Sequence, residues 1–326
     1  MLDRALACRS HLVNGLHDTA FRLFNGFTEG CGDIVIDLYG STAVLNNYAD
    51  PPMGGEPAVR AALEFLQVRL PWVRAAVLKK RNSQSLEERC GTVLFGQELT
   101  HRIQENGVWY ALNLTMSRDA SFHLDTRNLR RWSFEHLRDK TVLNLFAHTG
   151  SLGVAALAGG ASRVVQLDRN KRFLDLARAS YRLNRFAIRS EDILEADFFR
   201  QSARLRRKDQ RFDCVIIDPP YFASAPTGIV NQVSEGARLL NKVRPLVEGG
   251  GHLVAVNNAV FLSGAAYMQT LEAACADGYL KLAEMIPVPE DFTGYPETRT
   301  GEAITDPAPF NHSTKIAILE VRRKAV

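Results

Sequence analysis

A regular alternation of apolar strands and helical stretches begins near Lys140, and it limits the folds that this chain can adopt. Short apolar runs occur at 142–146, 164–168, 214–218 and 252–258, with helical periodicity between them. Strands that alternate with helices are typical of a parallel sheet covered by helices. The sequence therefore predicts an α/β fold for the larger part of the chain.

Three shorter apolar segments predict the remaining strands of this sheet. A brief third strand is expected near 188–194, and two closing strands at 281–286 and 315–322. Apolar residues at helical spacing predict the covering helices. These helices are expected at 151–157, 171–183, 231–247 and 266–277.

The first third of the chain predicts a separate, smaller α+β domain. Residues 33–47 are typical of two strands around a Gly40-Ser41 turn, and Asn106-Gly107 is a strong hairpin signal. The other expected elements are an amphipathic N-terminal helix, a helix at 56–69, strands at 75–80 and 92–96, and a hairpin over 101–114. We place the domain boundary between 118 and 119, so that residues 1–118 precede a larger domain over 119–326.

The charge of the chain permits a nucleic-acid partner without requiring one. The net charge is +4 with His neutral, and proteins with quite different partners share such a value. The basic residues gather in three runs, and a single run is more often a solvated face than a binding site. The runs are Lys79, Lys80 and Arg81; Arg127, Arg130 and Arg131; and Arg204, Arg206, Arg207 and Lys208.

Cysteine usage points to a reducing compartment. The chain has five cysteines, an odd number, and their spacing does not match a metal-binding motif. We therefore expect reduced thiols in a cytoplasmic protein, with no metal site. The N-terminal segment carries Asp3, Arg4 and Arg9 among its apolar residues, which is unlike a signal peptide. No stretch is apolar enough to predict a membrane span.

Ligands of open α/β sheets bind beyond the carboxyl ends of the strands, and the first candidate there is the turn FAHTGSLG at 146–153. Its glycines allow a ligand close to the backbone, and the helix that follows offers free N–H groups. Many α/β proteins carry such a turn. The turn therefore indicates a ligand site only together with other features.

Acidic residues follow the next two strands. Asp168 ends the second strand, where a carboxylate can accept hydrogen bonds from both ribose hydroxyls of an adenosine; a helix cap is the competing interpretation. Asp197 and Phe198 follow the third strand and suit the amine and ring of an adenine. A loop acid beside a core phenylalanine is the alternative for that pair.

The most specific feature is Asp218-Pro219-Pro220-Tyr221 at the end of the fourth strand. The two prolines fix an extended backbone and remove two N–H donors. We expect the neighbouring carbonyl groups to point outward as acceptors, and Tyr221 to stack on a planar substrate. A rigid loop with a surface tyrosine is the alternative. A dinucleotide dehydrogenase would share the glycine turn and Asp168 but has no use for this corner.

Taken together, these motifs resemble those of a known family. The segments NLFAHTG, VVQLD and DPPYF, with the acid at Asp197, are similar to the bacterial large-subunit (23S) ribosomal RNA methyltransferases. That family includes cytosine-C5 enzymes with an N-terminal PUA domain and the guanine-N7 half of a fused enzyme. The similarity extends upstream through FRLFNGFTEG and FHLDTRNLRR, covering about residues 20–326. We expect this chain to lack the PUA domain.

The resemblance implies a Rossmann-like class I methyltransferase that uses S-adenosylmethionine. It implies a seven-stranded sheet, preceded by an α+β domain that recognises RNA. The implied cofactor contacts are Phe122, Asp125, Arg127, Asn144, Phe146, Thr149, Gly150, Asp168, Asp197, Phe198 and Asp218. The corner Asp218, Pro219, Pro220 and Tyr221 would lie at the methyl-transfer centre, with Tyr221 and Phe222 facing the base. Two departures, His148 in place of a tyrosine and Thr126 in place of Gln or His, leave the class unchanged.

The residues after the fifth strand bear on the atom that is methylated. Cytosine-C5 members carry Ser-Cys-Ser there, whereas this chain has Asn257 and Asn258, as its guanine-N7 relatives do. Activating cytosine C5 normally needs a covalent thiolate, and Cys214 and Cys275 are poorly placed for that role. The resemblance therefore favours a purine nitrogen, with Asn257 and Asn258 near the substrate.

Three other functions remain open at this point. A methyltransferase of a small molecule or protein would keep the cofactor motifs without a basic first domain. A noncatalytic RNA-binding protein would not need an intact DPPY sequence. A nicotinamide oxidoreductase would leave that sequence unexplained.

Overall fold

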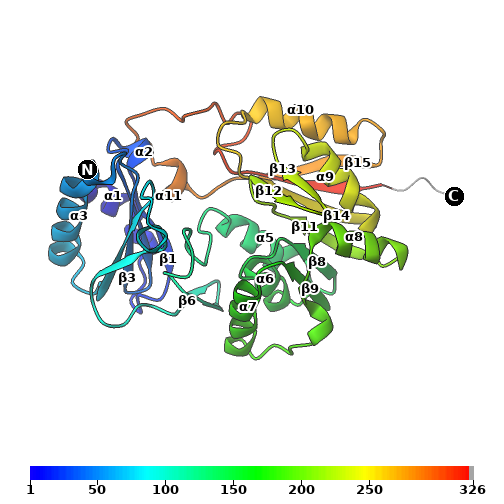
Figure 1. The fold of residues 1–326 in the computed structure, drawn as a ribbon, viewed down its shortest axis with the longest axis horizontal. Helices are drawn as coiled ribbons and strands as arrows, with labels where there is room; N and C mark the ends of the chain where they lie inside the picture. The colour runs from blue at the N-terminus through cyan, green and yellow to red at the C-terminus, as the bar shows by residue number, and fades with distance from the viewer. Residues whose placement is uncertain (323–326) are drawn as a thin grey trace. The chain divides into compact units, whose positions relative to one another are not determined.

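A computed structural model describes residues 1–322, which form two compact units (Figure 1). The first unit comprises Met1–Leu124 and Pro289–Ala303, and the second comprises Asp125–Val288 and the chain from Ile304 onward. This division falls slightly later than the boundary expected at 118. It also gives the first unit the segment 289–303, which the sequence analysis placed in the second domain.

The first unit is built on a five-stranded sheet with the order β1-β2-β3-β4-β5. The expected strands around the Gly40-Ser41 turn are confirmed, as are the helix at 56–69 and the strands near 75–80 and 92–96. The sheet strands are β1 (Ala20–Asn25), β2 (Ile34–Tyr39), β3 (Thr42–Asn47), β4 (Ala75–Lys80) and β5 (Thr92–Phe95). The helices are α1 (Leu2–Arg9), α2 (Gly26–Glu29), α3 (Glu56–Arg69), α4 (Leu86–Cys90) and α11 (Glu290–Thr293).

The expected hairpin of the first unit is also confirmed. Strands β6 (Arg102–Glu105) and β7 (Val108–Ala111) pair antiparallel around Asn106 and Gly107. Both turn residues have positive φ, 53° and 76°, which a two-residue turn of this kind requires.

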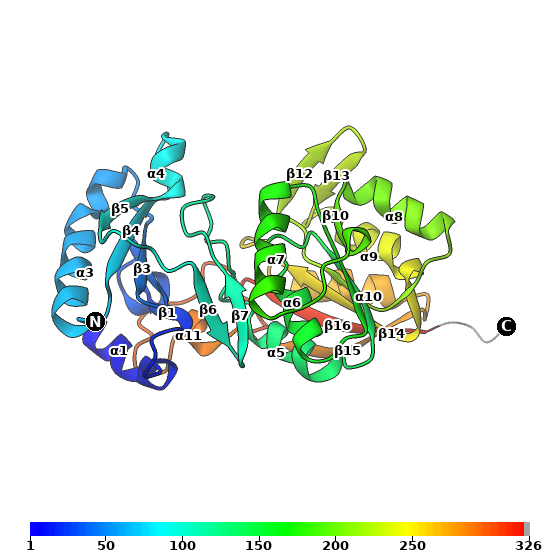
Figure 2. The same cartoon turned by 90° about the horizontal axis from the view of Figure 1, so that it is seen from below.

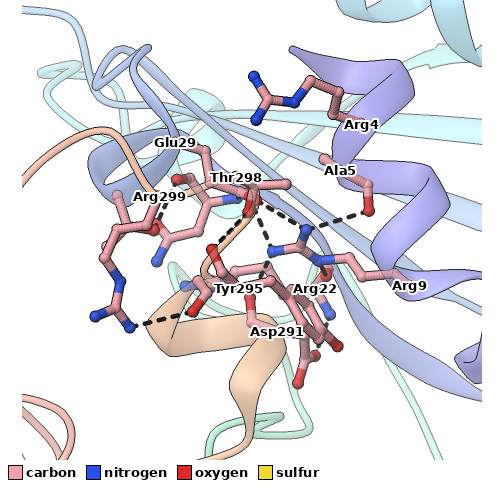
Figure 3. Close-up of polar contacts among 12 residues, drawn as sticks. Arg4, Ala5, Arg9, Arg22, Glu29, Asp291, Tyr295, Thr298 and Arg299 are labelled. Atoms are coloured by element: carbon pink, nitrogen blue, oxygen red, sulfur yellow. Dashed lines mark hydrogen bonds and ion pairs between the residues drawn. The ribbon is translucent and has the colours of Figure 1, made fainter.

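The segment 289–303 belongs to the first unit because a buried arginine bonds to it (Figure 3). The Arg9 guanidinium is fully buried and pairs with Glu29, 2.9 Å from Nη1 to Oε1. Its Nη2 also donates to the carbonyl oxygen of Asp291 at 3.1 Å. The Asp291 carboxylate in turn accepts the N–H of Arg22 at 2.8 Å. A charge without solvent needs such partners, so this cluster fixes α11 against α1 and β1.

The second unit contains the expected seven-stranded sheet, with the order β10-β9-β8-β11-β14-β16-β15. All neighbouring strands from β10 to β14 are parallel, and β16 is antiparallel to both of its neighbours. The strands are β8 (Thr141–Leu145), β9 (Arg163–Asp168), β10 (Ile193–Glu195), β11 (Phe212–Ile217), β14 (Val247–Asn257), β15 (Leu280–Ile286) and β16 (Lys315–Val321).

Helices cover both faces of this sheet, as Figure 1 shows. Alternate residues of one strand serve the two faces, so that Leu143 packs in the core beneath α8–α10 and Val142 packs beneath α5 and α6. The helices are α5 (Arg127–His136), α6 (Ser151–Ala158), α7 (Lys171–Leu183), α8 (Phe198–Arg207), α9 (Gly236–Val243) and α10 (Gly264–Cys275). The predicted α/β class and its seven-stranded sheet are therefore confirmed.

The expected helix over 231–247 is wrong at both ends. Asn231 instead ends a hairpin of β12 (Phe222–Ala225) and β13 (Gly228–Asn231), which projects from the second unit in Figure 2, and residues 232–235 form turns. Helix α9 begins only at Gly236, and Val247 already belongs to β14. The third strand is also shorter than expected, and helices α5 and α8 were not predicted.

Candidate functional site

The candidate site lies where the direction of strand order changes. Strand β8 pairs with β9 on one side and β11 on the other, and Leu145 is in register with both Leu167 and Ile217. The residues that follow these three strands therefore emerge at the same edge. In open α/β sheets, ligands bind at this position. Phe146, Asp168 and Asp218 are the residues brought together in this way.

The glycine turn at 146–153 has an unusual backbone. Phe146, His148 and Gly150 have positive φ values of 56°, 51° and 76°. A Cβ on Gly150 would lie 2.8 Å from Ala177 Cβ and 2.9 Å from Gln166 Nε2, so no other residue fits without displacement. Helix α6 begins within this segment, at Ser151, and its first N–H groups have no partner within the helix. The turn can therefore receive a polar ligand.

A buried amide pair supports the turn from inside the sheet. Asn144 Nδ2 donates to Gln166 Oε1 at 2.8 Å, and Gln166 Nε2 donates to the Gly150 carbonyl at 2.9 Å. Both side chains are almost fully buried. Asn144, expected as a cofactor contact, thus lies behind the turn and supports it through Gln166. Sequence reasoning missed Gln166, although a polar residue inside the apolar strand VVQLD was a visible signal.

Asp168 connects the second strand to the same turn. Its Oδ2 accepts the N–H of His148 and its Oδ1 accepts the N–H of Asn170, each at 2.8 Å. Helix α7 is capped by Asn170, whose side chain accepts the N–H of Arg172, so Asp168 is not the cap. Burial raises the pKa of Asp168, and these backbone hydrogen bonds oppose that rise. A carboxylate offers about four lone-pair sites, so Asp168 can still accept from a ligand.

Asp197 and Phe198 stand at the start of α8. Asp197 Oδ1 accepts the N–H of Arg200 at 3.0 Å, which makes it the helix cap. Phe198 is 2% exposed and packs against Phe146, with ring centroids 4.7 Å apart. The pair therefore has structural roles beside the turn. Contact of Asp197 and Phe198 with an adenine stays a prediction.

The remaining expected cofactor contacts are divided between the two units. Phe122 belongs to the first unit, where its buried ring lies 4.9 Å from that of Tyr110. In the second unit, Asp125 Oδ2 accepts a hydrogen bond from Thr314 Oγ1 at 2.8 Å, and Arg127 begins α5. Thr149 is buried within the glycine turn. Direct contacts of these four residues with a cofactor stay predictions.

The corner Asp218-Pro219-Pro220-Tyr221, called here the DPPY corner, follows β11. Tyr221 is 51% exposed, and Phe222, the first residue of β12, is 56% exposed. The expectation that the neighbouring carbonyl groups point outward is wrong for Pro219. Its oxygen accepts hydrogen bonds from Gln232 Nε2 and, at 3.4 Å, from Asn258 Nδ2. The corner therefore presents an aromatic side chain, while this carbonyl is used within the protein.

Asn257 and Asn258 lie beside the DPPY corner, at the end of β14. Asn257 is buried; its Nδ2 donates to the Gln232 carbonyl at 3.3 Å, and its Oδ1 accepts the N–H of Ala259. The N–H of Asn258 donates to Gln232 Oε1 at 2.7 Å. Both residues therefore bond to the protein, and their contact with a substrate stays a prediction. Gln232 was missed because its stretch was assigned to a helix.

The second unit contains two thiols, Cys214 and Cys275. Cys214 is fully buried inside β11, and burial raises the pKa of its thiol. Burial also raises the pKa of Cys275 on α10. Within residues 1–322, no cluster of three His, Cys, Asp or Glu side chains is arranged to hold a metal ion. None of the helices in this range combines the length and apolar character needed to cross a bilayer.

Two of the basic runs are used inside the protein. In the first unit, Lys79 is buried and donates to the Ser117 carbonyl at 2.8 Å, and Arg81 pairs with Asp119. Burial lowers the pKa of Lys79 to about 8. In the second unit, the Arg130 guanidinium is buried and donates to Thr126 Oγ1. The run over 204–208 differs, because its arginines and lysine are exposed at the end of α8.

Curated proteins of similar sequence carry a common name. Ribosomal RNA large subunit methyltransferase I of Aliivibrio fischeri (strain MJ11) is 29% identical over 288 residues, which cover 85% of this chain and 70% of the relative. The protein of the same name from Aeromonas salmonicida is 27% identical over 304 residues, covering 91% of this chain and 76% of the relative.

A solved structure has a similar fold. The crystal structure of SMU.776 complexed with SAH has a TM-score of 0.84 and 25% sequence identity, and the match covers 98% of this chain and 80% of that one. The sequence profile of one family, S-adenosylmethionine-dependent methyltransferase, matches residues 22–300. With its seven-stranded sheet and the glycine turn at the switch point, the chain belongs to the S-adenosylmethionine-dependent methyltransferases.

Proposed function

We propose that this enzyme methylates a base of RNA, in large-subunit (23S) ribosomal RNA, and that its target is a purine nitrogen. The observation that carries the proposal is the exposed aromatic pair Tyr221 and Phe222 at the carboxyl end of β11, next to the glycine turn. Aromatic side chains stack on unpaired bases of any sequence. The names of the sequence relatives, which are ribosomal RNA methyltransferases, support the same substrate.

The residues of the turn fit S-adenosylmethionine. Gly150 packs tightly against Ala177 and Gln166, which fixes the shape of the turn, and the first N–H groups of α6 lie beside it. Asp168 would accept the ribose hydroxyls with lone pairs that the backbone leaves free, and Asp197 would accept the adenine amine. Phe146 and Thr149 would line the same pocket. When bound, the cofactor supplies an electrophilic methyl group.

The substrate side of the site would be the DPPY corner. Tyr221 and Phe222 would stack on the base, and Asp218 would lie at the reacting centre together with Pro219 and Pro220. A nitrogen nucleophile brings its own lone pair, so the protein mainly orients the reactants, which is worth roughly 7–11 kcal/mol. The base must be unstacked or single-stranded to reach such a pocket.

A purine nitrogen is favoured because burial disfavours the thiolate of both cysteines in the second unit. Methylation of cytosine C5 normally proceeds through a covalent thiolate. Cys214 is buried with a raised pKa, which disfavours its thiolate. Asn257 and Asn258 occupy the end of β14, where C5 enzymes carry a cysteine. We place the enzyme in the cytoplasm, as the unpaired cysteines also indicate.

Nucleoside analysis of ribosomal RNA tests this function. Total 23S RNA from cells that lack the protein is compared by mass spectrometry with RNA from cells that express it. We expect one methylated purine to disappear in the deletion strain and to return with the wild-type protein, but not with Asp218→Ala. An unchanged set of methylated nucleosides would contradict an RNA substrate and would favour a small-molecule or protein substrate.

A further inference from the structure

We propose that Gln232 is a positioning residue that fixes the DPPY corner against the end of β14 during methyl transfer. The inference rests on the proposed function, because it concerns how the corner meets the base. Gln232 follows the β12–β13 hairpin, and only 2% of its surface is exposed. It is remote in sequence from both segments that it joins.

Gln232 makes four hydrogen bonds, and each one reaches the corner or the end of β14. Its N–H donates to the Tyr221 carbonyl at 3.1 Å, and its Nε2 donates to the Pro219 carbonyl. Its Oε1 accepts the N–H of Asn258 at 2.7 Å, and its carbonyl accepts Asn257 Nδ2 at 3.3 Å. Both ends of the side-chain amide are therefore used, one on each segment.

The two prolines leave the DPPY corner with few backbone N–H donors, so another residue must link the corner to β14. Pro219 and Pro220 have no N–H group, so the backbone cannot continue the ladder that joins β11 to β14. That ladder ends with Ile217 opposite Ala255. The Gln232 amide takes over directly beyond this point. It joins the two strand ends where neither prolyl residue can donate a bond.

The backbone of Gln232 also bonds beside the aromatic pair, and both proposed variants keep this bond. The bond from the Gln232 N–H to the Tyr221 carbonyl closes the base of the hairpin, directly beside the pair of Phe222 with Asn231. The side chains of Tyr221 and Phe222 are exposed, so packing contributes little to their position. A small cavity lined by Pro219, Gln232 and Tyr267, among others, lies beside the corner. Polar bonds rather than close packing therefore set where the aromatic pair stands.

This arrangement separates catalysis from cofactor binding. The four bonds of Gln232 reach residues 219–221 and 257–258, whereas the turn follows β8, Asp168 ends β9 and Asp197 caps α8. Loss of the Gln232 amide should therefore leave cofactor affinity intact and allow the base to shift. A misplacement of about 1 Å can reduce turnover by about a hundredfold.

Two variants and a matched control test the inference. Gln232→Met removes both polar ends at similar volume, and Gln232→Glu keeps an acceptor for Asn258 but removes the donor to Pro219. Gln201→Met, on α8 and outside this network, is the control. For Gln232→Met and Gln232→Glu we expect turnover on 23S RNA to fall by about tenfold to a hundredfold, with the dissociation constant of S-adenosylhomocysteine within about twofold of wild type. Gln201→Met should keep wild-type turnover.

Hydrogen exchange gives a readout that needs no RNA. In Gln232→Met, the amides of residues 221–232 and of Asn258 should exchange faster, whereas those of the turn at 146–153 should not change. Unchanged exchange at the corner would overturn the inference even if turnover fell. Wild-type turnover in a folded Gln232→Met would also overturn it. Failure of the wild-type enzyme to methylate RNA would instead refute the proposed function.

A double-mutant cycle distinguishes positioning from general destabilisation. Gln232 Nε2 and Asn258 Nδ2 both donate to the Pro219 carbonyl, so if the two residues hold the corner together, the losses of turnover in Gln232→Met and Asn258→Ala should be non-additive. Additive losses would contradict a shared link. Each variant is assayed well below its own unfolding temperature, so that loss of folded protein does not contribute.

Discussion

The backbone N–H of His148 donates a hydrogen bond to Asp168 Oδ2 at 2.8 Å. This bond ties the glycine turn after β8 to the carboxylate that ends β9. The acid therefore has two tasks in the proposed site: it shapes the turn that receives the cofactor, and it presents its remaining lone pairs to the ribose. A substitution there should affect both.

Asp168→Ala should weaken binding of S-adenosylhomocysteine by at least about 1.5–3 kcal/mol, the range for hydrogen bonds to a charged group. Calorimetry measures this change directly. Asp175→Ala is the matched control, because Asp175 is a surface acid on α7 that pairs with Lys171 and Arg178. Equal affinity in a folded Asp168→Ala would remove the residue from the site.

Gly150→Ala should abolish detectable cofactor binding, whereas Gly107→Ala should not. Both glycines have a φ of 76°, so alanine suffers similar backbone strain at each, of order 1–3 kcal/mol. Only Gly150 also has Ala177 and Gln166 within 3 Å of the added Cβ, since the space around Gly107 is open. Thermal unfolding and S-adenosylhomocysteine titration of the two variants distinguish the effect of backbone strain from that of the clash with Ala177 and Gln166. Similar losses in both would contradict a tightly packed turn.

Tyr221→Ala should lower methylation strongly without weakening cofactor binding. The ring is half exposed, so its removal costs little stability, while stacking on a base is worth roughly 1–3 kcal/mol by alanine substitution. Tyr221→Phe keeps the stacking surface and should retain most of the activity. Steady-state rates on 23S RNA and calorimetry with S-adenosylhomocysteine provide the two readouts. Full activity of the alanine variant would exclude stacking at this position.

Lys315 should make stability depend on alkaline pH. The side chain is fully buried, donates to the carbonyl groups of Ala259 and Ser313, and has its pKa lowered by burial to about 8 from 10.5. Between pH 8 and 10.5, Lys315 is protonated in the unfolded chain but largely neutral in the folded one. The free energy of unfolding therefore rises with pH in this range, by at most about 1.4 kcal/mol per pH unit. Urea unfolding from pH 7.5 to 9.5 should show a steeper rise for wild type than for Lys315→Met. Parallel curves would show that Lys315 titrates normally.

The sequence was most informative where apolar runs are short and bounded. The strands from Thr141 to Asp168 and the helix at 171–183 were predicted almost to the residue, because their apolar spacing has one simple solution. Helix α8 was missed because its arginines were interpreted as a charge run, although Phe198, Ser202 and Leu205 occupy one buried face. The start of α9 was placed at 231 instead of Gly236, because apolar spacing alone did not exclude the turn residues 232–235.

Most polar contacts within the site could not be predicted from the sequence. The strand-end residues Phe146, Asp168 and Asp218 were predicted together because parallel strands bring their carboxyl ends to one edge. Gln166 and Gln232 act through hydrogen bonds to backbone groups far away in the sequence, which leave no local pattern. Lys79 looked like a surface charge and is buried, because its role depends on a carbonyl thirty-eight residues later.

The most direct test of the central claim is methyl transfer to unmodified 23S RNA by a variant in which all five cysteines are replaced. Cys214 is exchanged for Ala because its site is buried and apolar, and the four half-buried thiols are exchanged for Ser. A purine nitrogen needs no covalent thiolate, so the variant should retain turnover. With S-adenosylmethionine labelled in its methyl group, nucleoside analysis should find the label in a methylated purine. If one cysteine proves essential in a protein that still folds and binds S-adenosylhomocysteine, or if the label appears in 5-methylcytidine, the purine-nitrogen assignment is wrong.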